Sequence, residues 1–140
     1  VEGKHIRTDG LRMFEVYPHP AHIRLFDRSA IIRYKRKCGV AQQRAGLSEL
    51  RDLTAKLAVD RDPRLCAGFH GRAFLSRDLS TMKGRALKEY EDLLDAWTCV
   101  YLAMHLSRWG SEGNEVFGAR ESGYIIVPRY RSDFHESKTS

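Results

Sequence analysis

The chain of 140 residues has three cysteines, four prolines and no long apolar run. Cys38, Cys66 and Cys99 lack the close pairs of a zinc site, and their odd number does not suit a disulfide framework. No apolar stretch approaches the roughly 20 residues of a membrane span, and the first residues lack the apolar segment of a signal peptide. The sequence therefore predicts a soluble protein of the reducing cytoplasm with no membrane partner.

Several catalytic signatures are also missing. Neither a Walker loop nor a glycine-rich dinucleotide fingerprint occurs. The cysteines have no histidine near them in the sequence, and the serines fall mainly in expected turns, which argues against nucleophilic catalysis. His19 and His22 have HxxH spacing, but Pro18 and Pro20 predict a turn there and no further ligand is near. A zinc site at this pair is therefore not expected.

The composition is that of one globular domain with an excess of positive charge. Hydrophobic residues make up 42%, charged residues 30%, and the net charge is +6. Four basic residues surround Tyr34 within residues 33–37, which we call the basic loop: Arg33, Lys35, Arg36 and Lys37. Such clusters are typical of nucleic-acid-binding surfaces, although a basic run is more often a solvated loop. Tyr34 either stacks on a base or anchors the loop in the core, and the sequence leaves both open.

The apolar periodicity predicts a helix-rich chain. We expect a short helix over residues 21–26, an amphipathic helix over 43–59 and a long helix over 83–108. Residues 65–80 remain ambiguous because two glycines oppose a long element there. The apolar stripe of the long helix consists of Leu87, Tyr90, Leu94, Trp97, Tyr101 and Met104.

Residues 11–17 are rich in strand formers and are followed by Pro18, so they predict a buried strand that ends near Tyr17. Alternation places Met13, Glu15 and Tyr17 on one face of this strand. Glu15 is then a lone acid among apolar residues, which is unfavourable unless it is paired or bound to a cation.

The C-terminal part of the sequence predicts a turn at 110–114 and a short strand over 123–128. Residues after Pro128 are mostly polar. We therefore expect a single domain over residues 1–128 and a flexible tail over 129–140.

Asp92 and Asp95 are spaced three apart on the long helix, pointing away from its apolar stripe. Further along that side the helix turns apolar, so we expect the two acids at the edge of an enclosed surface. Neighbouring carboxylates repel, which raises one pKa or recruits a cation such as Mg²⁺. The alternative is that they are ordinary surface acids balanced by Lys88 and Arg85. The apolar residues on that side are Ala96, Cys99, Leu102, Ala103 and Leu106.

Three segments, taken together and in order, resemble the domain of unknown function 429 family. They are residues 15–18, residues 33–35, and residues 92–96 followed by 121–128. The resemblance spans roughly residues 11–128. This family is generally described as predicted nucleases of the RNase H-like fold.

The resemblance implies an α/β, partial RNase H-like fold and a metal-dependent nuclease that cleaves phosphodiester bonds. Nucleases of that fold hold two divalent ions between a strand carboxylate and helix carboxylates. By position, Glu15 is the strand ligand, and Asp92 and Asp95 are the helix ligands, for Mg or Mn. These three are the expected catalytic and metal residues. The expected nucleic-acid-binding residues are Arg33, Tyr34, Lys35, Arg36 and Lys37.

The chain departs from the RNase H-like pattern at its start. The β-meander that usually carries a central aspartate has no counterpart, since about ten residues precede Leu11. We therefore expect the C-terminal part of a family member, with an exposed strand edge that favours self-association. Two alternatives to a nuclease remain: a noncatalytic nucleic-acid-binding module, and an oligomerisation domain anchored by Trp97, Tyr101 and Trp109.

Overall fold

The structure, a computed structural model, describes residues 13–134 and divides the chain into two compact units. Unit 1 comprises residues 1–31 and 99–140, and unit 2 comprises residues 32–98. The fold is mixed α/β and helix-rich, with one two-stranded antiparallel sheet among the described residues. This confirms the expected class, while the single domain over 1–128 stays a prediction.

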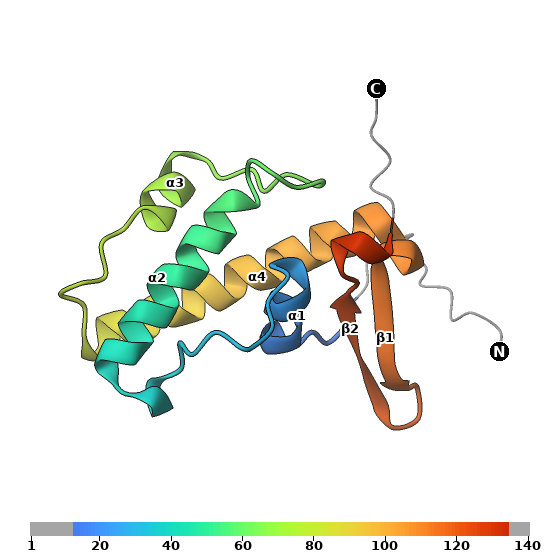
Figure 1. Cartoon of the computed structure of the whole chain (residues 1–140), viewed down its shortest axis with the longest axis horizontal. Coiled ribbons are helices and arrows are strands. Elements are labelled where there is room, and N and C mark those ends of the chain that lie inside the picture. The colour runs from blue at the N-terminus through green and yellow to red at the C-terminus, as the bar shows by residue number, and fades with distance from the viewer. Residues whose placement is uncertain (1–12, 135–140) are drawn as a thin grey trace. The chain divides into compact units, whose positions relative to one another are not determined.

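Unit 2 is built on helix α2 (Val40–Lys56), helix α3 (Phe69–Leu75) and the N-terminal half of α4 (Gly84–Gly113) (Figure 1). α2 begins and ends three residues before the predicted 43–59. Gly39, with φ of 85°, marks its start. α3 lies in the segment that the sequence left ambiguous, and it contacts α2. α4 agrees closely with the predicted 83–108 and extends beyond it.

Aromatic stacking and leucines form the core of unit 2. The Phe74 ring stacks on Tyr90 with centroids 4.4 Å apart and on Trp97 with centroids 6.2 Å apart. The Tyr90 hydroxyl donates a hydrogen bond of 3.0 Å to the Phe74 carbonyl. The buried leucines of the unit are Leu47, Leu50, Leu57, Leu65, Leu75, Leu79, Leu87 and Leu94.

Gly46 lets α2 approach the segment that enters the basic loop. A Cβ at this position would overlap the Arg33 carbonyl oxygen and lie 2.6 Å from its carbon and 3.0 Å from the Tyr34 Cα. All three atoms belong to backbone, which cannot swing aside. Only glycine therefore fits here.

Unit 1 contains helix α1 (Pro18–Leu25), which contacts strand β2 (Gly123–Pro128). α1 begins three residues earlier than the predicted 21–26, so the expected turn at Pro18 and Pro20 is wrong. Proline is favoured in the first turn of a helix, where its missing N–H has no helical partner to lose. Arg24 of α1 donates to Glu115 at 2.7 Å and ties the helix to the sheet.

The sheet of unit 1 is a hairpin of β1 (Asn114–Ala119) and β2, paired from Asn114 with Pro128 to Ala119 with Gly123. The predicted strand over 123–128 is confirmed. The predicted turn at 110–114 is wrong in part: Gly110 interrupts α4 with φ of 49°, but a strand starts at Asn114. The Asn114 side chain secures this junction: its Oδ1 accepts from His105 Nδ1 at 3.1 Å, and its Nδ2 donates to the Gly110 carbonyl at 2.8 Å.

The predicted strand over 11–17 does not form as a regular strand in its described part; residues 11 and 12 lie outside the described residues. Glu15 alone makes a parallel bridge, to Ile125, and its carbonyl accepts from the Ile126 amide at 3.2 Å. The predicted alternation holds, but the face of Met13, Glu15 and Tyr17 is exposed. The expected burial of Glu15 is therefore wrong, and its carboxylate needs no compensating partner.

Packing in unit 1 extends past Pro128. Arg131–Asp133 form the short 3-10 helix η2, and the Phe134 ring meets Trp109 at 5.3 Å and His105 at 5.8 Å. Residues 135–140 of the predicted tail lie outside the described residues. Tyr101 and Trp109 are buried, at 1% and 6% exposure, so they serve the core rather than the proposed oligomer interface.

We expect Gly46→Ala to lower the free energy of unfolding by about 2 kcal/mol, because the new methyl group overlaps fixed backbone. Gly68→Ala is the matched control, since a Cβ there meets nothing within 4 Å. Urea unfolding of both variants checks this expectation. Equal stability of the two variants would contradict it.

Candidate functional site

The basic loop buries one side chain, half-buries another and exposes three. Tyr34 is fully buried at 0% exposure, whereas Arg33, Arg36 and Lys37 are exposed. Lys35 lies between these extremes, with 39% of its side chain exposed. The loop then turns through the 3-10 helix η1 (Arg36–Cys38) and enters α2. Of the two readings of Tyr34, the structure adopts the core anchor, so this ring does not stack on a base.

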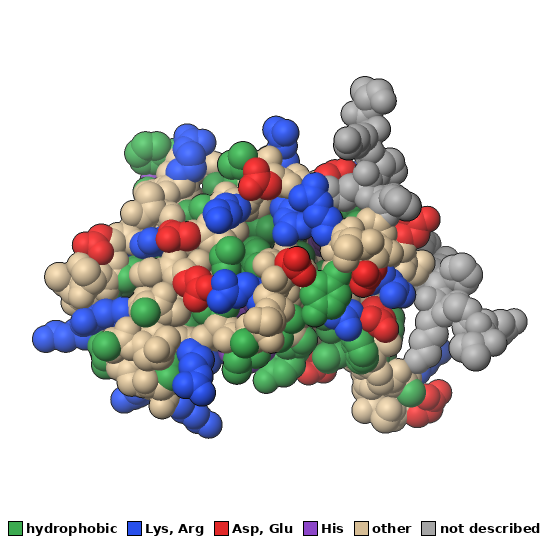
Figure 2. Space-filling view, in the orientation of Figure 1, with side chains coloured by type: hydrophobic (Ala, Val, Ile, Leu, Met, Phe, Trp, Pro, Cys, Tyr) green, Lys and Arg blue, Asp and Glu red, His purple; other side chains and the backbone are tan. Residues whose placement is uncertain are grey.

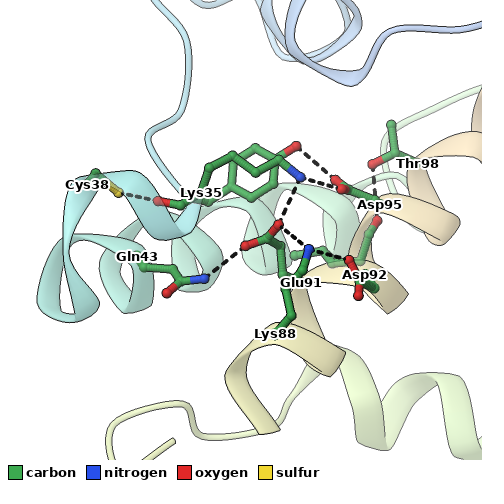
Figure 3. Close-up of polar contacts among 10 residues, drawn as sticks. Lys35, Cys38, Gln43, Lys88, Glu91, Asp92, Asp95 and Thr98 are labelled. Atoms are coloured by element: carbon green, nitrogen blue, oxygen red, sulfur yellow. Dashed lines mark hydrogen bonds and ion pairs between the residues drawn. The ribbon is translucent and has the colours of Figure 1, made fainter. Parts of the chain in front are cut away.

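The half-buried Lys35 side chain reaches toward acids of α4 (Figure 3). Its Nζ donates to Asp95 Oδ2 at 2.5 Å and to Glu91 Oε1 at 3.1 Å. The neighbouring Tyr34 hydroxyl donates to the other Asp95 oxygen at 2.8 Å. Burial alone would lower the pKa of Lys35, but the hydrogen bonds to Asp95 and Glu91 outweigh it and raise the pKa. The Lys35 ammonium is therefore held in its charged form.

Glu91 is the buried acid of this site, with only 3% of its side chain exposed. Oε2 accepts from Gln43 at 2.8 Å, while Oε1 accepts from Lys88 at 3.0 Å and from Lys35 at 3.1 Å. Burial by itself would raise the pKa of Glu91, but these donors together hold it below its usual range. Three donors, from the basic loop, α2 and α4, thus stabilise one buried carboxylate.

Asp92 lies at the exposed edge of the same cluster, with 61% of its side chain exposed. It accepts from Lys88 at 2.6 Å. Hydrogen bonds to Asp92 and then to Glu91 raise the pKa of Lys88 to about 12. The cluster of Lys35, Lys88, Glu91, Asp92 and Asp95, which we call the lysine–carboxylate cluster, therefore balances three carboxylates with two ammonium groups.

Asp92 and Asp95 each pair with a lysine of this chain, Asp92 with Lys88 and Asp95 with Lys35. Asp92 pairs with Lys88, as the surface-acid alternative predicts, but Arg85 pairs with Glu89 instead, at 2.7 Å. The expected enclosure of this side of the helix is wrong. Three of its five apolar residues, Ala96, Cys99 and Ala103, are exposed.

The expected metal triad divides between the units: Glu15 belongs to unit 1, and Asp92 and Asp95 belong to unit 2. Its convergence stays a prediction. Within residues 13–134, no group of three or more His, Cys, Asp or Glu side chains has a geometry that could hold a metal ion. In unit 2, Lys35 donates to Asp95 Oδ2 and Lys88 donates to Asp92 Oδ1, while a divalent ion at these acids stays a prediction.

Glu91 and Gln43 are site residues that the sequence patterns did not predict. Glu91 follows Leu87 by four residues and precedes Leu94 by three, so it lies on the buried stripe of the helix. A charged residue on such a stripe signals a compensated buried acid. Gln43, 48 residues away in the sequence, carries no comparable signal.

A model of the family described as "Protein of unknown function (DUF429)" matches residues 3–120 of the chain. The comparisons with curated proteins and with solved structures found no match. Among the described residues, no helix is both long enough and apolar enough to cross a membrane.

We expect Glu91→Gln to lower the free energy of unfolding at pH 7 by about 1–3 kcal/mol, because it removes charge-assisted hydrogen bonds to a buried group. Since folding lowers the pKa of Glu91, its stabilisation is present above the unfolded pKa of about 4.3. It is lost as the pH falls through the folded pKa. The variant should therefore lose less stability than wild type on acidification from about pH 5 to pH 3.

Urea unfolding across this pH range measures the difference. Asp92→Asn is the matched control, since Asp92 is exposed and its removal should change stability by less than about 0.5 kcal/mol. Parallel pH curves for wild type and Glu91→Gln would contradict the assigned role of Glu91.

Proposed function

The chain belongs to the DUF429 family, and from this premise we propose that it binds the phosphate backbone of nucleic acid through its basic loop. One observation supports this most strongly: a fixed loop presents Arg33, Arg36 and Lys37 to solvent. Within residues 13–134, none of these three side chains forms an ion pair. Their positive charges are thus available to phosphate oxygens.

The proposed phosphate binding depends on where the basic side chains lie more than on the net charge of the chain. Acidic side chains lie among the Lys and Arg side chains on the face drawn in Figure 2, so basic charge does not cover that face evenly. In the basic loop, by contrast, three exposed cations lie within five residues. Arginine and lysine bind phosphate without reading bases, and the buried Tyr34 offers no stacking platform. We therefore propose binding that is independent of sequence and strongly dependent on salt.

We propose that this noncatalytic binding operates on a scaffold related to the RNase H-like fold, as the family resemblance implies. The mixed α/β, helix-rich secondary structure supports the α/β class of that fold. All three cysteines are free, which supports our proposal of a reducing, cytoplasmic location.

Metal-dependent phosphodiester hydrolysis is the second candidate. It is favoured by the family resemblance and by three carboxylates that lie within one five-residue stretch of α4: Glu91, Asp92 and Asp95. Bound Mg or Mn would supply Lewis-acid activation of water and phosphate. Such an ion would compete with Lys35 for Asp95 Oδ2 and with Lys88 for Asp92 Oδ1.

Self-association through the sheet edge is a further proposal about partners. Within the described residues, β1 pairs only with β2, so its other edge has no described strand against it. Light scattering that gives a monomer mass at every concentration would exclude this proposal.

For the leading proposal, we expect R33A/R36A/K37A to weaken binding of a labelled DNA or RNA oligonucleotide. Each lost phosphate contact should reduce the slope of log affinity against log salt by about 0.9 on duplex DNA. Fluorescence anisotropy between about 50 and 200 mM salt measures both quantities.

The matched control is K56A/R64A/R77A, which removes three exposed basic side chains of unit 2 outside the loop. This control should keep the wild-type affinity and slope. Equal losses in both triple variants would indicate general charge attraction and contradict a binding site at the loop.

For the second candidate, we expect saturable Mg²⁺ or Mn²⁺ binding in calorimetry, which D92N/D95N abolishes and Glu15→Gln weakens. Glu89→Gln, an exposed acid of the same helix, is the control and should change nothing. Wild-type protein that gives no saturable heat and cleaves no oligonucleotide would remove the metal-dependent candidate while leaving the binding proposal intact.

A further inference from the structure

We propose that Lys35 is a positioning residue: it makes no contact with phosphate but holds the basic loop in the conformation that binds it. This inference rests on the proposed nucleic-acid binding. It assigns Lys35 a different role from Arg33, Arg36 and Lys37, although all four are neighbours in the sequence. It also differs from the sequence-based expectation that Lys35 itself holds the backbone phosphates.

The electrostatic surroundings of Lys35 separate it from its neighbours. Its ammonium group lies against two carboxylates, at 2.5 Å from Asp95 and 3.1 Å from Glu91. The lysine–carboxylate cluster contains one more carboxylate than ammonium groups, so it repels an approaching phosphate. Lys35 directs two of its three N–H donors to these carboxylates, and their negative charge lies closer to its ammonium group than any approaching phosphate can.

The backbone of Lys35 connects this side-chain anchor to the exposed cations. The Lys35 carbonyl accepts from the Cys38 amide at 3.1 Å and from the Cys38 thiol at 2.8 Å. The Arg36 carbonyl accepts from the Gly39 amide at 3.2 Å. These bonds close η1, which carries Arg36 and Lys37. Fixing Lys35 therefore fixes the turn from which two of the binding side chains project.

The preceding residue strengthens the same anchor. The buried Tyr34 donates to the Asp95 oxygen that Lys35 leaves open, and the Lys35 Nζ lies 4.6 Å from the centre of the Tyr34 ring. Close packing of Gly46 against the Arg33 carbonyl holds the loop on the α2 side. The loop is thus ordered before a ligand arrives, which reduces the entropy lost on binding.

The test compares Lys35→Met with Lys37→Met, two equal chemical changes in one loop. Lys37→Met should reduce the salt slope by about 0.9 on duplex DNA, the effect of one lost phosphate contact. Lys35→Met should keep the wild-type slope but bind roughly three- to tenfold more weakly, because a disordered loop must be ordered on binding. Lys35→Arg, which can still reach both carboxylates, should restore wild-type affinity.

A slope that falls by about 0.9 in Lys35→Met would show a direct phosphate contact and overturn the proposal. Unchanged affinity in Lys35→Met would overturn it as well. If Lys35→Met does not fold by circular dichroism, Asp95→Asn takes its place, since it weakens the same anchor without removing a basic residue.

Amide hydrogen exchange separates this inference from the proposed function because it needs no nucleic acid. In Lys35→Met, the Cys38 and Gly39 amides should exchange at least about threefold faster, since their acceptors are the carbonyls of residues 35 and 36. Lys37→Met should leave those rates unchanged. Unchanged exchange in Lys35→Met overturns the positioning role, whereas equal oligonucleotide binding by wild type and R33A/R36A/K37A overturns the proposed function.

Discussion

The arrangement of unit 2 depends on compensating one buried carboxylate, that of Glu91. A carboxylate with 3% exposure is strongly unfavourable unless hydrogen bonds and opposite charge replace its lost water. Gln43 from α2, Lys88 from α4 and Lys35 from the basic loop supply that replacement. Because one acid takes donors from three segments, its requirement for partners determines how the loop, α2 and α4 meet.

The need of Glu91 for partners also distinguishes Lys35 from the other basic residues of the loop. The residue that satisfies the acid, Lys35, is held against α4, whereas Arg33, Arg36 and Lys37 project into solvent. A run of like charges would otherwise repel itself and remain mobile. Here the acids of α4 neutralise one cation of the run and anchor its backbone. The remaining three cations then belong to an ordered surface, which is what phosphate binding needs.

Local patterns predicted the elements but not their partners. The 3.6-residue period predicted α4, and a proline-closed run of β-formers predicted β2. Pro18 predicts the end of a strand, but proline also begins helices, and here it begins α1. The glycines before Asn114 predict a turn, and β1 begins at Asn114 instead. The spacing of Asp92 and Asp95 located the acidic part of α4, but the Lys35 partner lies 56 residues from Glu91 in the sequence. Only tertiary packing brings such residues together, so spacing rules cannot identify them.

The acids of α4 can hold either the Lys35 ammonium group or a divalent ion, and the two roles have different consequences for the basic loop. A divalent ion and an ammonium group compete for carboxylate oxygens, so a metal ion at Asp95 Oδ2 or Glu91 Oε1 would compete with Lys35. Displacing Lys35 would also free the loop that it anchors, together with the cations that we propose to hold phosphate. Metal binding at these acids and an ordered basic loop therefore oppose each other within unit 2. The acids of α4 that hold Lys35 thus support the ordered loop on which the proposed phosphate binding depends.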